Sequence, residues 1–175
     1  MKKIFLRGRP GIGKTTLIKR IAEELKRRKK KVFGFYTEEM REKGERVGFK
    51  VKGLNGGEEI MAYIHFSTPY RVSKYRVDRD RFEKIALSEL AKGKEEGGLV
   101  IIDEIGKMEL FSERFKELVW ELMESESPVI ATIPIAPLPF LQRLLEDFKI
   151  EIIEIDLTNR DRLAKEWERF LGIDG

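Results

Sequence analysis

The chain has 175 residues, of which 41% are hydrophobic and 38% are charged, and 35 basic residues against 31 acidic ones give a net charge of +4. This length favours one soluble globular domain, and a net charge this small does not require a nucleic-acid partner. Without cysteine and with His65 as its single histidine, the chain cannot form disulfides, thiolate metal sites or histidine-only metal sites.

The composition also indicates where in the cell, and at what temperature, the protein works. No apolar run approaches the ~20 residues that cross a bilayer, and the first residues are too polar for a signal peptide. We therefore expect a cytoplasmic protein without a membrane partner, whose metal, if any, has oxygen ligands. Abundant Lys and Glu with two Asn and one Gln is the pattern associated with proteins that work at high temperature.

The first predicted strand, residues 3–7, leads into a glycine-rich loop. Residues 8–15 read Gly-Arg-Pro-Gly-Ile-Gly-Lys-Thr, and residues 16–29 have apolar side chains at helical spacing. This order is the context that the G-x-x-x-x-G-K-[ST] phosphate-binding loop requires. Its glycines let successive N–H groups point at a phosphate chain, while Lys14 reaches the β- and γ-phosphates and Thr15 can ligate Mg²⁺. The following helix directs its positive dipole end at the phosphates, so the sequence predicts a nucleotide site here.

The remaining predicted elements alternate between strand and helix. We expect strands at residues 31–37, 98–102, 128–133 and 150–156, with helices at 79–92, 112–123, 139–148 and 158–172. Asp78 and Thr158 are the predicted N-caps of the first and last of these helices. Two further strands, 46–52 and 58–66, form a hairpin around an Asn-Gly turn. This order predicts an α/β fold with a mainly parallel sheet flanked by helices, one inserted β-hairpin and a single domain over residues 1–175.

The strand at residues 98–102 ends in two carboxylates, Asp103 and Glu104. Open α/β sheets bind ligands at the carboxyl ends of their strands. We expect Asp103 to hold Mg²⁺ beside Thr15, and Glu104 to orient or activate water. Lys14 and Glu104 are thus the predicted catalytic residues, and paired acids favour the branch of P-loop proteins that carries a catalytic glutamate.

Residues 103–110, Asp-Glu-Ile-Gly-Lys-Met-Glu-Leu, with Gly-Phe-Tyr-Thr-Glu-Glu at 34–39 and Gly-Phe at 48–49, resemble the small nucleoside-triphosphatase family of thermophilic archaea and bacteria. The vertebrate cancer-related nucleoside triphosphatase is similar. The resemblance covers essentially the whole chain, including residues 131–134 and 158–160. It implies a RecA-like P-loop NTPase and Mg²⁺-dependent hydrolysis of the terminal phosphate of ATP, GTP, CTP, UTP and TTP. The nucleotide-binding residues that it implies are Gly8, Arg9, Pro10, Gly11, Ile12, Gly13, Lys14, Thr15, Thr16, Leu99, Val100, Ile101, Ile102, Asp103, Glu104, Ile105 and Gly106.

Further polar residues each have two interpretations. Lys107 and Glu109 either face the γ-phosphate or pair on the surface, and Thr132 either contacts the attacking water or is a strand residue. An arginine finger, which stabilises charge in phosphoryl transfer, is one interpretation for Arg9, Arg41 and Arg46, and an exposed loop position is the other. Asn159 and Arg160 either contact a base or simply begin the last helix.

Two other functions remain open at the level of sequence. A nucleotide or small-molecule kinase would bind an anionic acceptor through the basic residues Arg71, Lys74, Arg76, Arg79 and Arg81. A nucleotide-dependent RNA-binding module would use the basic run 26–31, although that run also suits the solvated end of the first helix. We expect nucleoside triphosphates as partners and a monomer, with an arginine from a second subunit as the alternative.

Overall fold

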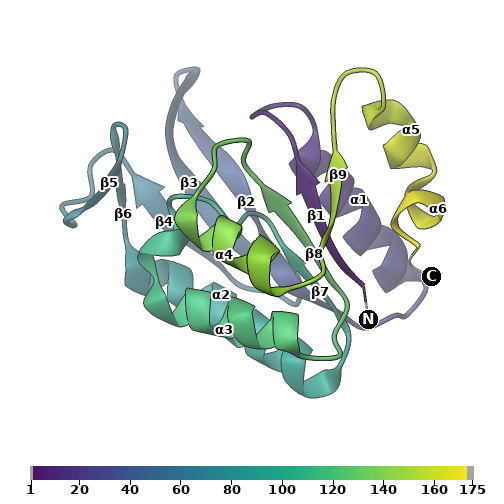
Figure 1. The fold of residues 1–175 in the computed structure, drawn as a ribbon. Coiled ribbons are helices and arrows are strands. Elements are labelled where there is room, and N and C mark those ends of the chain that lie inside the picture. Colours follow the sequence, from purple (N-terminus) through teal and green to yellow (C-terminus); the bar gives the residue numbers. More distant parts are fainter. Residues whose placement is uncertain (1, 173–175) are drawn as a thin grey trace.

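The fold, taken from a computed structural model that describes residues 2–172, is built on one nine-stranded sheet with the order β5-β6-β4-β3-β2-β7-β8-β1-β9 (Figure 1). The strands are β1 Lys3–Arg7, β2 Val32–Glu42, β3 Glu45–Gly53, β4 Glu58–Tyr63, β5 Tyr70–Val72, β6 Tyr75–Val77, β7 Leu99–Ile102, β8 Val129–Ile133 and β9 Glu151–Glu154. The helices are α1 Lys14–Arg27, α2 Arg79–Glu96, the short 3₁₀ helix η1 Glu109–Phe111, α3 Glu113–Glu124, α4 Pro139–Asp147, α5 Arg160–Lys165 and α6 Trp167–Leu171.

The adjacent strands β2, β7, β8, β1 and β9 run parallel to one another. The strands β1, β7 and β8 and the first half of β2 are buried because helices cover each side of the sheet, which explains their largely apolar sequences. Phe5 packs in the cluster formed with α2, α3 and α4, whereas its neighbours Ile4 and Leu6 pack in the cluster formed with α1, α5 and α6. Figure 1 shows the two groups of helices on opposite faces. The predicted parallel α/β core is thus confirmed.

The antiparallel part of the sheet is larger than the single predicted hairpin. The hairpin of β3 and β4 is present, but β2 runs on to Glu42 and pairs antiparallel with β3. The strands β5 and β6 form a second hairpin that continues the sheet beyond β4. The prediction of a strand ending at residue 37 was therefore too short, because the outer half of β2 is polar and lies beyond the buried core.

The helix termini agree with the sequence at most positions. Asp78 caps α2 by accepting a hydrogen bond from the Arg81 N–H, as predicted. The prediction for the last helix was wrong in two respects. It consists of two short helices, α5 and α6, and Asn159 rather than Thr158 occupies the N-cap position of α5. The hydroxyl of Thr158 instead donates to Asp156, so its capping capacity is used inside the preceding turn.

Among the described helices, none has both the length and the apolar composition that a bilayer crossing requires.

Candidate active site

The loop between β1 and α1 has the backbone conformation that its glycines allow. Gly11 and Gly13 have φ values of 79° and 115°, in the left-handed region that favours glycine. A Cβ atom at Gly8 would lie 2.9 Å from Ile12 Cγ2 and 2.9 Å from the Ile155 carbonyl oxygen. The loop therefore needs glycine for conformation at its tip and for close packing at its base.

Lys14, the first residue of α1, is 8% exposed, and its ammonium group is held by neighbouring oxygen atoms. Nζ donates to the carbonyl oxygens of Gly8 at 2.6 Å and Ile133 at 3.1 Å, and lies 3.7 Å from Glu104 Oε2. The ammonium group thus lies between the loop, the end of β8 and the end of β7. The structure brings the two predicted catalytic residues together.

The carboxylate of Asp103 connects three elements at the carboxyl edge of the sheet. Thr15 Oγ1 donates to Oδ2 at 2.8 Å, Thr132 Oγ1 donates to Oδ1 at 2.6 Å, and the Thr37 N–H lies 3.5 Å from Oδ2. Asp103 is 3% exposed, and burial raises its pKa, although the bonds from Thr132 and Thr15 oppose that shift. The predicted pair of Thr15 and Asp103 is therefore in direct contact.

A hydroxyl and a carboxylate are the hard oxygen donors that Mg²⁺ prefers. Between residues 2 and 172 there is no ion pair to Asp103, so its buried charge lacks a directly paired cation. No cluster of three or more His, Cys, Asp or Glu side chains suited to a metal occurs in that part of the chain. The chemistry of the pair Thr15 and Asp103 thus fits Mg²⁺ better than a metal that needs nitrogen or sulfur ligands.

Two glutamates lie beside this centre. Burial raises the pKa of Glu104, the Lys14 ammonium opposes that shift, and the Asp103 charge adds to it. Glu109 is 4% exposed and accepts a hydrogen bond from the Gly106 N–H at 3.1 Å. Burial, followed by the charge of Glu104, raises the pKa of Glu109 well above its ordinary value. The Glu109 carboxyl therefore keeps its proton over a wider pH range than an exposed glutamate does.

A pocket of about 630 Å³ opens over these groups, within the usual range for small-molecule sites. We call it the nucleotide pocket. Its lining residues are Pro10, Gly11, Gly13, Lys14, Thr15, Thr16, Lys19, Tyr36, Thr37, Glu38, Glu39, Arg41, Arg46, Phe49, Asp103, Glu104 and Pro134. Two of these lining residues, Lys19 and Tyr36, had no predicted role. The ring of Tyr36 lies 5.3 Å from the Lys19 ammonium. The available signal was the position of Tyr36 in the 34–39 motif, at the carboxyl end of a parallel strand.

The other predicted nucleotide-binding residues do not line the nucleotide pocket. The buried strand β7 consists of Leu99, Val100, Ile101 and Ile102, and Asp103 follows directly after it. Four more of these residues are buried: Gly8, Ile12, Ile105 and Gly106. Arg9 is exposed to solvent and does not line the nucleotide pocket.

Arg41 and Arg46 line the nucleotide pocket but already have partners. Both guanidinium groups pair with Glu39, at 3.0 and 3.1 Å, and Arg46 also donates to the Tyr75 hydroxyl at 2.8 Å. Asn159 lies outside the pocket and donates to the Glu154 carbonyl oxygen.

The remaining candidates lie apart from the nucleotide pocket as well. Arg160 Nη1 lies 3.5 Å from the Ile12 carbonyl oxygen, behind the loop, and His65 stacks edge-on against Tyr63. Lys107 and Glu109 line a separate cavity, described below.

Of the basic residues proposed to hold an acceptor, Arg71 and Arg76 are register partners across β5 and β6, but most of the five already have partners of their own. Arg76 donates to the Thr68 carbonyl oxygen, Arg79 lies over the Tyr70 ring, and Arg81 pairs with Glu59 and Asp78. The basic run 26–31 is at the end of α1, as predicted, where Arg27 and Arg28 pair with Glu24 and Lys31 with Glu96.

Known proteins resemble this chain over almost its whole length. The chain is 44% identical to the nucleoside-triphosphatase THEP1 of Thermotoga maritima over 164 residues, which cover 94% of this chain and 92% of that protein. The crystal structure of THEP1 from Aquifex aeolicus is similar, with a TM-score of 0.86 and 36% identity over 98% of this chain and 99% of that one. The solution structure of a human cancer-related nucleoside triphosphatase has a TM-score of 0.83 and 33% identity, covering 97% of each chain. A family model described as NTPase matches residues 3–167, and the chain therefore belongs to this NTPase family.

Proposed function

We propose that this protein hydrolyses nucleoside triphosphates to diphosphate and phosphate, with Mg²⁺ as its cofactor and with little discrimination between bases. The observation that carries the proposal is the contact between Thr15 and Asp103, which joins the glycine-rich loop to the acidic end of β7. The names of its relatives, nucleoside-triphosphatase and nucleoside triphosphatase, support the same activity.

Each residue of the centre has a proposed role in this reaction. Loop N–H groups and Lys14 stabilise negative charge on the β- and γ-phosphates, mainly by positioning and electrostatics. Thr15 and Asp103 supply oxygen ligands to Mg²⁺, which when bound neutralises charge on the phosphate oxygens. Glu104 accepts a hydrogen bond from the attacking water and takes its proton. The raised pKa of Glu104 suits this role, because a base is most efficient when its pKa approaches the working pH.

Lys14 also links substrate binding to the state of Glu104. Its ammonium group is 3.7 Å from the Glu104 carboxylate and can instead contact a bound phosphate. When the ammonium group turns to the phosphate, the Glu104 carboxylate loses part of its charge compensation and becomes a stronger base.

The broad base range is supported by an aromatic side chain in the lining. Tyr36 lines the nucleotide pocket, and stacking on an aromatic ring accepts every base because each has a π face. We further propose that residues 1–175 act as one domain, since the groups of the centre come from neighbouring strands of one sheet.

Phosphate release tests the proposal directly. ATP, GTP, CTP, UTP and TTP are each incubated with the protein at high temperature, with Mg²⁺ or with a chelator. We expect phosphate from all five with Mg²⁺ and none above background with the chelator. Absence of phosphate from every nucleotide would refute the activity. Formation of nucleoside diphosphate from an added monophosphate, without free phosphate, would instead show a kinase.

A further inference from the structure

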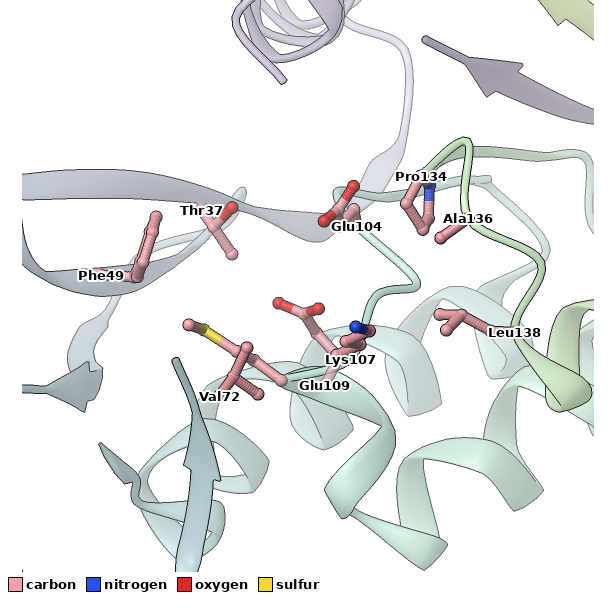
Figure 2. A pocket seen from close by; sticks show the side chains of 10 residues that line it. Thr37, Phe49, Val72, Glu104, Lys107, Glu109, Pro134, Ala136 and Leu138 are labelled. Atoms are coloured by element: carbon pink, nitrogen blue, oxygen red, sulfur yellow. The ribbon is translucent and has the colours of Figure 1, made fainter. Parts of the chain in front are cut away.

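A second cavity, of about 230 Å³, adjoins the nucleotide pocket at Glu104. We call it the side cavity. It shares Thr37, Phe49, Glu104 and Pro134 with the nucleotide pocket, so the two spaces have a common wall. Figure 2 shows the carboxylates of Glu104 and Glu109 facing this hollow from opposite sides. The side cavity therefore begins at the carboxylate that we propose as the base.

The rest of the side cavity has a largely apolar lining. Its aliphatic and thioether surface comes from Val72, Met108, Ala136 and Leu138, and Phe49 adds an aromatic ring. Glu109 keeps its proton more readily than an exposed glutamate, so its carboxyl can donate a hydrogen bond to an occupant. This lining suits an uncharged, mainly apolar molecular body.

The side cavity adjoins an outer groove of about 500 Å³, since Val72, Lys107 and Leu138 line both. The charged residues that line the groove are Arg71, Lys107 and Lys116, and no carboxylate lines it. Lys116 pairs with exposed Glu113 at 3.2 Å. Within residues 2–172, Arg71 and Lys107 have no carboxylate within ion-pair distance. The mouth of the side cavity is therefore positive, while its inner end has carboxyl groups.

This distribution of charge defines the occupant. We propose that the side cavity and the outer groove form a second ligand site, for a small organic anion with an apolar body. The anionic group lies at the groove, near Arg71 and Lys107, because cations attract it there and the Glu104 carboxylate repels it at the inner end. The apolar body fills the side cavity and removes apolar surface from water.

The site also has a consequence for hydrolysis, and this part rests on the proposed function. The inner end of the bound molecule lies beside Glu104, which lines both the side cavity and the nucleotide pocket. Occupation of the side cavity therefore leaves less room for water around Glu104 and slows phosphate release. The nucleotide itself keeps its own pocket.

The probe is anilinonaphthalene sulfonate, an aromatic anion whose fluorescence rises in apolar surroundings. We expect one probe molecule to bind per chain, with the same affinity when a non-hydrolysable ATP analogue saturates the nucleotide pocket. Saturation with the probe should lower ATP hydrolysis. Displacement of the probe by the ATP analogue, or failure of the probe to bind, would overturn the proposal.

Variants locate the probe. Val72→Trp should abolish binding because the larger side chain fills the side cavity, and Leu138→Trp provides the same test if Val72→Trp does not fold. Arg71→Ala should weaken binding about twofold to fivefold, the range for an exposed ion pair. Lys74→Ala is the matched control, since it removes the same charge from the same hairpin at a residue that lines neither space.

The results separate the two proposals. Equal effects of Arg71→Ala and Lys74→Ala, or unchanged binding in a folded Val72→Trp protein, would refute the second site. A chain that binds the probe as described but releases no phosphate would refute the proposed function and leave the second site standing.

Discussion

The substitution Thr132→Val tests the buried contact on which the geometry of Asp103 depends. Thr132 is fully buried, and its hydroxyl donates to Asp103 Oδ1 at 2.6 Å. Valine has nearly the same shape but no donor, so the carboxylate loses one of its two hydroxyl partners. A hydrogen bond to a charged group contributes about 1.5–3 kcal/mol, and we expect the free energy of unfolding to fall by about 2 kcal/mol at neutral pH. The pKa of Asp103 should also rise further, because this bond opposes the effect of burial.

Denaturant unfolding measures the loss of stability, and phosphate release at saturating nucleotide measures the effect on turnover. We expect turnover to fall about tenfold or more, since each 1.4 kcal/mol of lost transition-state stabilisation is tenfold in rate. Thr132→Ser is the matched control: it loses a methyl group, at a cost of about 1 kcal/mol, but keeps the donor and should keep turnover. A Val variant that unfolds at the wild-type midpoint and hydrolyses nucleotide at the wild-type rate would refute this role for Thr132.

Three further substitutions test other parts of the account. Lys14→Ala should abolish phosphate release and weaken nucleotide binding in an equilibrium titration, and unchanged binding would argue against contact with the phosphates. Glu109→Gln keeps an acceptor for the Gly106 N–H without the titrating group. The pKa of the Glu109 carboxyl is well above 4.5 in the folded protein. The contribution of this carboxyl to the free energy of unfolding is therefore complete below pH 4.5 and is lost as pH rises through the pKa of the folded protein. Denaturant unfolding across this range should therefore show the variant gaining stability over the wild type as pH rises, and a constant difference would contradict the shift. Asp78→Ala should lower the free energy of unfolding by about 1 kcal/mol by removing the N-cap of α2, and a loss near zero would contradict that role.

The parallel core could be predicted because its sequence signals are local. The apolar runs of β1 and β7 and the helical spacing in α1 depend on burial against neighbouring layers, which leaves a periodic pattern in the chain. The glycine-rich loop was predictable for a similar reason, since its conformation requires specific residue types. The meeting of Thr15 with Asp103 followed from placing both at the carboxyl edge of one sheet.

The antiparallel extension could not be predicted in the same way. The strands β5 and β6 have three residues each, too few for an alternating pattern, and the outer half of β2 is polar because it extends past the core. The break between α5 and α6 likewise has no glycine or proline to mark it. Tyr36 lies within the predicted part of β2 and was left without a role, whereas Arg41 and Arg46 were considered as arginine fingers or exposed loop residues.

For Thr132 the sequence allowed two interpretations, and the fold adds a contact that neither of them included. The residue is a buried strand position, and its hydroxyl is bound to Asp103. Contact with an attacking water stays a prediction. A pairing between the ends of two different strands leaves no pattern in either segment alone.

The central claim is that Glu104 activates the attacking water while Lys14, Thr15 and Asp103 bind the substrate. Glu104→Gln separates these functions, because glutamine keeps the size of the side chain and cannot accept the proton. The decisive measurement is nucleotide affinity and single-turnover phosphate release on the same Glu104→Gln preparation. We predict an affinity close to that of the wild type and a rate lower by about 10²-fold or more, the usual contribution of a general base. A rate equal to that of the wild type would contradict the account.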